Sequence, residues 1–130
     1  LARRVSLRTH LLSSSLPVHG DRVQLQQVLL NLVLNACESM SAADVEERLL
    51  TVTTTIENGF ASMSVADLGI GIPDDQLTAV FEPFVTFRER GLGLGLAISR
   101  SLVVAHGGQI VARNNTDRGA TFTCILPLRR

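Results

Sequence analysis

The chain has 130 residues, of which 45% are hydrophobic and 18% charged, so it can bury one core and is not an intrinsically disordered segment. Its 12 basic and 12 acidic side chains cancel, which argues against a dedicated nucleic-acid binder or a polybasic membrane binder. Two cysteines, Cys37 and Cys124, are too few for a metal cluster, and Asn31 and Asn35 interrupt the longest apolar stretch. We therefore expect one domain over residues 1–130, without nucleic-acid or direct membrane contact.

The N-terminal part predicts a strand followed by a long helix. Residues 1–12 alternate loosely between apolar and polar side chains, which is typical of a strand. Gly20 and Asp21 supply a turn and a helix N-cap, and residues 22–40 then carry apolar side chains at helical spacing.

Two pairs of β-rich segments predict hairpins. Asn58-Gly59, the dipeptide that joins the first pair, favours a tight hairpin turn. The segments are residues 49–57 with 60–67, and residues 109–113 with 119–127.

Between the hairpins, Gly- and Pro-rich residues 68–93 predict mostly loop with a short helix near 75–81, and residues 94–105 predict a second helix that ends at His106-Gly107-Gly108. This order of elements differs from regular βαβ alternation. It predicts a two-layer α/β sandwich, in which a mixed, mostly antiparallel sheet is covered on one face by about three helices.

Five polar side chains form one stripe along the predicted 22–40 helix, at steps of three or four residues: Gln24, Gln27, Asn31, Asn35 and Glu38. A solvated stripe normally carries Lys, Glu or Arg, whereas each mid-helix asparagine disfavours the helix by roughly 0.5 kcal/mol. A solvated face is the alternative, but the pattern favours a ligand-facing stripe. Because an amide oxygen suits Mg²⁺, we expect Asn35 to be a metal ligand.

A carboxylate and two glycines follow the first predicted hairpin, in the segment DLGIGIP at residues 67–73. Gly69 and Gly71 allow the backbone to approach a planar ligand closely. A buried Asp67 needs a hydrogen-bond donor, and the exocyclic amino group of a purine would supply one. A strand-end Asp that stabilises a turn is the alternative.

A glycine-leucine run leads directly into the second predicted helix: Gly91, Leu92, Gly93, Leu94, Gly95 and Leu96. Exposed backbone N–H groups and the partial positive charge of the helix N-terminus can hold a polyphosphate without a net-basic protein. The spacing matches neither a Rossmann fingerprint nor a P-loop. A flexible hinge is the alternative.

In their order and spacing, these motifs resemble the N, G1, F and G2 boxes of the Bergerat-fold ATP-binding domain, most closely that of bacterial two-component sensor histidine kinases. The resemblance covers the chain from about Asp21 to Leu128. The matching segments are QVLLNLVLNA at 27–36, DLGIGIP at 67–73, FEPF at 81–84, GLGLGL at 91–96 and GATF at 119–122.

The resemblance implies that ATP and Mg²⁺ bind at these boxes. Asn35 would coordinate Mg²⁺ between the phosphates, with Asn31 supporting the polyphosphate side of the pocket. Asp67 would accept a hydrogen bond from the adenine amino group, while Gly69 and Gly71 let the loop close over the base.

The resemblance also assigns the C-terminal half of the site. Residues 81–87 resemble the mobile ATP lid, and the backbone of residues 91–96 would bind phosphates. Arg88 stands where related lids often carry Lys and would neutralise phosphate charge, a solvated lid charge being the alternative. Thr121 would help to hold the adenine through its hydroxyl or a water.

Two departures from the family pattern argue against tight nucleotide retention. Glu38 occupies a place where many relatives carry a phosphate-contacting Lys, so we expect it at the rim of the pocket. The lid is short, since only residues 85–90 separate FEPF from the G2 glycines.

The implied reaction transfers the γ-phosphoryl group of ATP to a histidine on a separate dimerisation domain, with a response regulator as an indirect partner. His10, His19 and His106 lack the family's phosphoacceptor context, so we expect them to be structural or surface residues. The chain starts at Leu1 without Met and lacks a secretory signal, so we expect a piece of a longer protein. By itself it would be monomeric and cytoplasmic, tethered to a membrane only through a preceding part.

Three other functions stay open at this point. An ATP hydrolase or clamp of the same superfold would need a Glu one turn before the metal-binding Asn, where this chain has Asn31. A serine kinase of the anti-sigma-factor type and a non-catalytic nucleotide-sensing module use the same binding residues.

Overall fold

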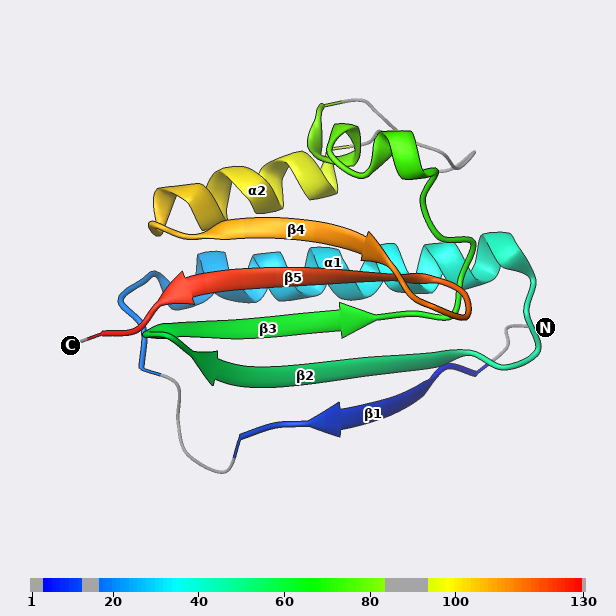
Figure 1. Ribbon diagram of the computed structural model, residues 1–130, viewed down its shortest axis with the longest axis horizontal. Helices are drawn as coiled ribbons and strands as arrows, with labels where there is room; N and C mark the ends of the chain where they lie inside the picture. The colour runs from blue at the N-terminus through cyan, green and yellow to red at the C-terminus, as the bar shows by residue number, and fades with distance from the viewer. Residues whose placement is uncertain (1–3, 13–16, 84–93, 130) are drawn as a thin grey trace.

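The computed structural model describes residues 4–12, 17–83 and 94–129, which form one five-stranded sheet with two α-helices packed on one face (Figure 1). The strands lie in the order β1-β2-β3-β5-β4, with β1 and β2 parallel and the other pairs antiparallel. The elements are β1 (Ser6–His10), α1 (Arg22–Ala43), β2 (Leu49–Glu57), β3 (Phe60–Ala66), the 3-10 segments η1 (Asp74–Gln76) and η2 (Ala79–Phe81), α2 (Gly95–Ala105), β4 (Gln109–Asn114) and β5 (Ala120–Pro127). The two-layer α/β sandwich expected from the sequence is confirmed.

The third helix, expected near 75–81, consists instead of η1 and η2, so the described part of the chain holds two α-helices rather than about three. Seven residues make only about two helical turns, too few to offset the cost of helix nucleation without extensive packing. The second segment buries Val80 and Phe81 in the core, and the Phe81 ring packs edge-on against Phe122 at a centroid distance of 6.0 Å.

The start of α1 is capped as expected and is also tied to the end of α2. Asp21 Oδ1 accepts a hydrogen bond from the Gln24 amide at 3.1 Å. The Asp21 amide donates to His106 Nε2 at 3.0 Å, and His106 Nδ1 lies 2.7 Å from Leu102 O. Because Leu102 O can only accept, His106 is the neutral Nδ1–H tautomer and has the structural role that we expected.

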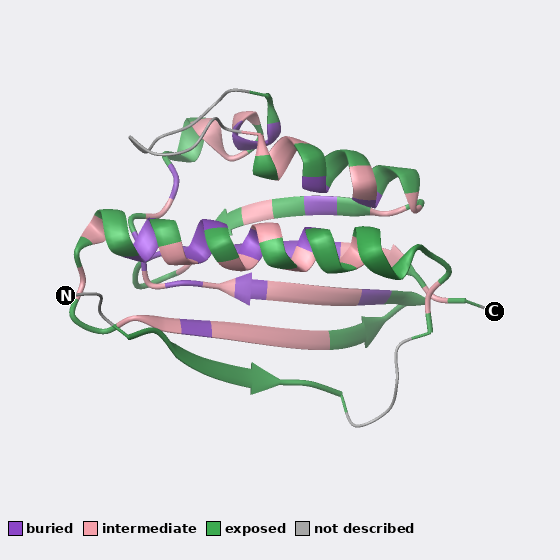
Figure 2. Cartoon of the chain, turned by 180° about the vertical axis from the view of Figure 1, so that it is seen from behind, coloured by how far each residue is buried: buried purple, intermediate pink, exposed green. Residues whose placement is uncertain are grey.

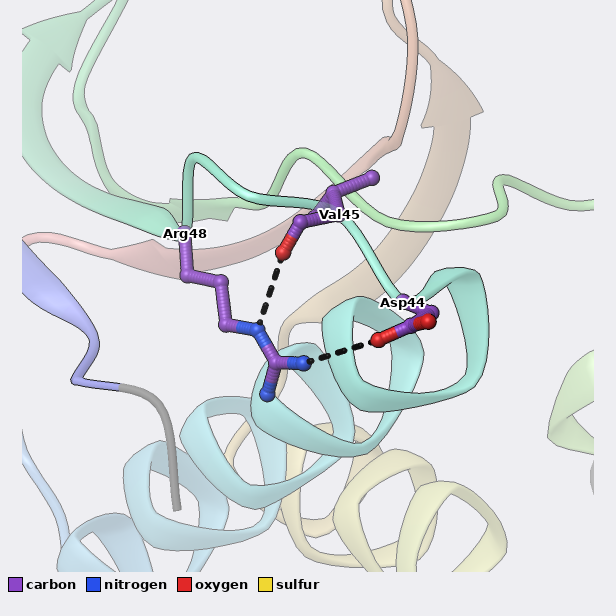
Figure 3. A network of polar contacts seen from close by, with 3 residues as sticks. All are labelled: Asp44, Val45 and Arg48. Carbon is purple, nitrogen blue, oxygen red and sulfur yellow. Dashed lines mark hydrogen bonds and ion pairs between the residues drawn. The ribbon is translucent and has the colours of Figure 1, made fainter. Parts of the chain in front are cut away.

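The end of α1 reverses sharply into β2 (Figure 3). Asp44 adopts the left-handed conformation, with φ of 51°, and its amide donates to Ser41 O. Arg48 Nε donates to Val45 O at 3.2 Å, and its guanidinium lies 3.9 Å from the Asp44 carboxylate. These contacts fix the turn that leads into β2.

The hairpin between β2 and β3 turns at Asn58-Gly59, as the sequence predicts. Asn58 and Gly59 have φ of 52° and 81°, the signs required by a type I′ turn. Glu57 therefore pairs with Phe60, and Thr51 with Ala66, without a slip in register.

The sheet has one apolar face and one hydroxyl-rich face. Alternate residues such as Val65 and Phe122 point into the core beneath the helices, where burial runs along the inner side of α1 (Figure 2). On the other face Ser64 and Thr123 share a hydrogen bond across β3 and β5. This alternation decides which side chains near the strand ends can reach a site between sheet and helices.

Candidate functional site

The polar stripe of α1 faces α2 near its middle rather than bulk water. Asn31 Nδ2 donates to Gly95 O and to Ser99 Oγ, both at 3.1 Å, and Asn31 Oδ1 accepts from Gln27 Nε2 at 2.8 Å. Asn31 thus holds the first turn of α2 against α1. Sequence reasoning did not single out Ser99, because its role depends on how the two helices pack.

One and two turns further along α1, the buried polar residues are Asn35 and Ser39. Asn35 is only 6% exposed, and Ser39 Oγ accepts from the Ile70 amide at 3.1 Å. Asn35 therefore lies between the turn that contacts the start of α2 and the turn that contacts the loop after β3. Glu38 is exposed, in line with a place at the rim.

Asp67 follows β3 and is 1% exposed. Its Oδ1 accepts from the amides of Gly69, at 2.8 Å, and Ala120, at 3.2 Å. Its own amide donates to Ala120 O at 2.9 Å, which continues the β3–β5 pairing by one residue. Two backbone donors on one oxygen fix the orientation of the carboxyl group.

Two glycines near Asp67 allow backbone contacts that a side chain would prevent. A Cβ at Gly69 would lie 2.1 Å from Ser39 Oγ, and a Cβ at Gly119 would lie 2.1 Å from Asp67 O. Gly119 also has φ of 83°. Gly119 belongs to the GATF motif, which was the available signal for its importance.

Asn114 and Asn115, which lie between the two segments of the second predicted hairpin, contact the loop after β3. Asn114 pairs through its amide with both backbone groups of Ile72, and Asn115 Nδ2 donates to Asp67 O at 2.9 Å. Gly71, with φ of 73°, packs against Asn114, whose Oδ1 would lie 3.0 Å from an added Cβ.

Thr121 does not fit the expected adenine contact. It is paired with Ala66 and points to the same face of the sheet as Thr123. Val65 and, two residues later, Asp67 point to the opposite face, beneath the helices. The Thr121 hydroxyl donates to Asn115 Oδ1. The strand alternation thus directs this hydroxyl away from the helix layer, and among the described residues Thr121 contacts the site through Asn115.

The phosphate end of the expected site begins at α2. Leu94 is its N-cap residue, and since Leu has no polar side chain, the N–H groups of the first turn receive no side-chain cap. Gly95 and Leu96 form that first turn. The other residues expected here lie outside the described residues: Arg88, Gly91, Leu92, Gly93 and lid residues 84–87.

The donor chemistry fits a magnesium ion that is shared with a nucleotide. In residues 4–12, 17–83 and 94–129, no group of three or more His, Cys, Asp or Glu side chains could hold a metal by itself. Mg²⁺ commonly takes one or two protein oxygens and completes its shell with water and phosphate. The buried amide of Asn35 suits such a partial set.

Neither cysteine is suited to act as a nucleophile. Burial raises the pKa of the Cys124 thiol to about 11. Burial also raises the pKa of Cys37, and the carboxylates of Asp67 and Glu38 add to that effect. Both thiols are therefore protonated at neutral pH.

A family model described as "Histidine kinase-, DNA gyrase B-, and HSP90-like ATPase" matches residues 20–130. Sensor protein FixL of Bradyrhizobium diazoefficiens is 41% identical over 125 residues, which are 96% of this chain and 25% of that protein. Sensor histidine kinase ZraS of Escherichia coli is 36% identical over 127 residues, which are 98% and 26%. The chain thus spans about a quarter of the length of these relatives.

Solved structures of histidine kinases are also similar to this chain. The mycobacterial sensor histidine kinase MprB superposes with a TM-score of 0.82 at 28% identity, over 96% of this chain and 83% of that one. The catalytic domain of histidine kinase ThkA superposes with a TM-score of 0.81 at 31% identity, over 95% and 80%. No helix within the described residues is long and apolar enough to cross a membrane.

Proposed function

The chain belongs to the histidine kinase-, DNA gyrase B-, and HSP90-like ATPase family, as the catalytic ATP-binding domain of a sensor histidine kinase, and on that premise we propose that it binds ATP with Mg²⁺ and donates the γ-phosphoryl group to a histidine on a separate dimerisation domain. The single observation that carries the proposal is the buried Asp67 carboxylate, oriented by two backbone amides beside α1 and β5. A purine amino group is the donor that such an acceptor selects.

The base would bind near the C-terminal end of α1's polar stripe and the phosphates near its middle. Asp67 would accept from the adenine amino group, with the backbone of Gly69 and Gly71 against the ring. The N-terminus of α2, from Leu94 to Leu96, would face the phosphates, where its N–H groups and dipole favour negative charge.

Between those two positions, Asn35 would hold Mg²⁺ through its amide oxygen. When bound, the ion neutralises phosphate charge as the phosphoryl group is transferred. Asn31 keeps the start of α2 in place through Gly95 O and Ser99 Oγ, so that the chain contributes orientation more than covalent chemistry.

Hydrolysis of ATP is the second candidate, and Asn31 weighs against it. We place Asn31 where hydrolases of this superfold would carry a Glu that activates water. An amide is a poor general base, and this one donates to two groups of α2.

We further propose that the parent protein supplies the dimerisation domain and that a response regulator receives the phosphoryl group. A structure of histidine kinase ThkA in complex with response regulator protein TrrA resembles this chain with a TM-score of 0.78 at 28% identity, which supports that assignment. Because ATP is the donor, we place the reaction in the cytoplasm.

Labelled ATP and a purified histidine-bearing dimerisation helix pair test the proposal. We expect label on the helix pair that is labile in acid and stable in base, as a phosphohistidine is. Label stable in acid would favour a serine kinase, released phosphate alone would favour a hydrolase, and binding without either would favour a nucleotide-sensing module.

A further inference from the structure

The segment from Asp67 to Pro73 has no regular secondary structure, yet side chains from elsewhere bond its backbone. Irregular buried backbone must find partners for its N–H and C=O groups outside its own segment. Ser39 Oγ on α1 accepts from the Ile70 amide at 3.1 Å. Asn114 at the end of β4 and Asn115 directly after it form hydrogen bonds with Ile72 and Asp67, at the two ends of the segment.

Asn114 holds the far end of the segment. Its Oδ1 accepts from the Ile72 amide at 2.8 Å, and its Nδ2 donates to Ile72 O at 2.6 Å and to Asp74 Oδ1 at 3.1 Å. The side-chain amide therefore pairs with both backbone groups of one residue, as a neighbouring strand would. This contact joins parts of the chain that are 42 residues apart.

Asn115 holds the near end. Its Nδ2 donates to Asp67 O at 2.9 Å and to Arg118 O at 3.1 Å, while its Oδ1 accepts from the Thr121 hydroxyl. Thr121 thus sets the direction of the Asn115 amide, and Asn115 sets the position of the Asp67 backbone. We call Asn114 and Asn115 the asparagine clamp.

We propose that the asparagine clamp is a positioning element for base recognition, which determines how strongly the site prefers a purine that carries an amino group. This inference rests on the proposed function of Asp67. The Gly69 amide that orients the Asp67 carboxylate belongs to the clamped segment. Releasing Ile72 frees that segment, and the carboxylate loses its fixed direction toward the amino group while the phosphate end is unaffected.

The test compares ATP with inosine triphosphate, in which a carbonyl oxygen replaces the amino group. Calorimetric titration of the 130-residue chain in Mg²⁺ gives the ratio of the two dissociation constants. For the unmodified chain we expect ATP to bind about a hundredfold more tightly, since a site built around a donor rejects the analogue without it. In Asn114→Ala the ratio falls by about tenfold, which corresponds to the loss of one or two hydrogen bonds.

Two further variants make the result specific. Ser62→Ala removes a hydroxyl contact with Thr55 between β2 and β3, far along the sheet, and leaves the ratio unchanged. Asn114→Asp combined with Asp74→Asn keeps an acceptor for the Ile72 amide and a donor–acceptor pair with position 74, but it loses the donor to Ile72 O. We therefore expect the ratio to lie between those of Asn114→Ala and the unmodified chain. If Asn114→Ala does not fold, Asn115→Ala, which removes the bond to Asp67 O, takes its place.

The outcomes separate the two proposals. If the unmodified chain binds ATP and inosine triphosphate equally, the assignment of Asp67 fails, and the clamp proposal fails with it. If the unmodified chain prefers ATP and folded Asn114→Ala or Asn115→Ala keeps the full ratio with only a lower melting temperature, the clamp is merely structural and this inference alone is overturned.

Discussion

The base end and the phosphate end of the candidate site are built differently. At the base end, a segment without regular structure is held by side chains from α1 and from the end of β4, and Asp67 is oriented by two amides. At the phosphate end, the Asn31 side chain bonds two groups in the first turns of α2, and residues 84–93 lie outside the described part of the chain.

The difference follows from what each end must recognise. Accepting a hydrogen bond from one amino group is directional, so the carboxylate must be fixed from several sides. Holding phosphates depends on N–H groups and on the field of a helix N-terminus, so it needs only the helix in the right place. Selectivity for the base and affinity for the phosphates should therefore be separable by mutation.

Gly119→Ala should disrupt the base end most severely. The added Cβ would lie 2.1 Å from Asp67 O at a residue with φ of 83°. We expect urea unfolding to give a free energy of unfolding lower by about 3 kcal/mol or more. Gly59→Ala is the matched control: its φ is 81° and nothing lies within 4 Å of the added Cβ, so it should lose only about 1 kcal/mol. Equal losses in both variants would contradict the close contact at Asp67.

Asp67→Asn should abolish most nucleotide binding while the fold persists. The amide presents a donor where the carboxylate accepts, and the Gly69 and Ala120 amides lose a charged partner. Affinity for ATP should fall by about a hundredfold in calorimetric titration. Asp75→Asn, at an exposed carboxylate in η1, should bind as the unmodified chain does. An unaltered affinity in Asp67→Asn would remove the adenine assignment.

Asn31→Ala should weaken the phosphate end without altering base selectivity. Removing the bonds to Gly95 O and Ser99 Oγ loosens the start of α2, and affinity for ATP should fall by about tenfold. Because the base end is untouched, affinity for inosine triphosphate should fall by the same factor. A change confined to ATP would mean that the two ends are not separable.

Alkaline pH probes the core that both ends share. The sequence has no Lys and no Tyr, so between pH 9 and 11 the cysteines are the side chains that titrate. Burial raises the pKa of Cys124 from 9.0 to about 11, so its contribution to stability is complete below pH 9 and is lost as pH rises toward 11. The free energy of unfolding should fall by about 1 kcal/mol between pH 9 and pH 10.

Cys124→Ala supplies the control for this measurement. In this variant the free energy of unfolding should fall clearly less over the same pH range. The remaining fall is due to Cys37, whose pKa is also raised. An unchanged slope in Cys124→Ala would show that this thiol is not the group responsible.

Local patterns account for much of what could be predicted. The hairpin at Asn58-Gly59, the N-cap at Asp21 and the position of Asp67 at the end of a strand all follow from residues close together in sequence. Each depends on backbone preferences or on a periodicity that neighbouring residues determine. For the same reason, the polar stripe of α1 and the start of α2 could be identified as parts of a site.

Contacts between distant segments could not be predicted in this way. Asn114 and Asn115 look like ordinary turn residues, and only the fold brings them to the segment at Asp67, more than 40 residues away. The side of the sheet that Thr121 faces depends on strand register, where a shift of one residue reverses every side chain. The sequence by itself thus determined which elements form and which chemistry they carry. The tertiary structure alone decided which side chains hold the site together, because that depends on packing between segments that are far apart along the chain.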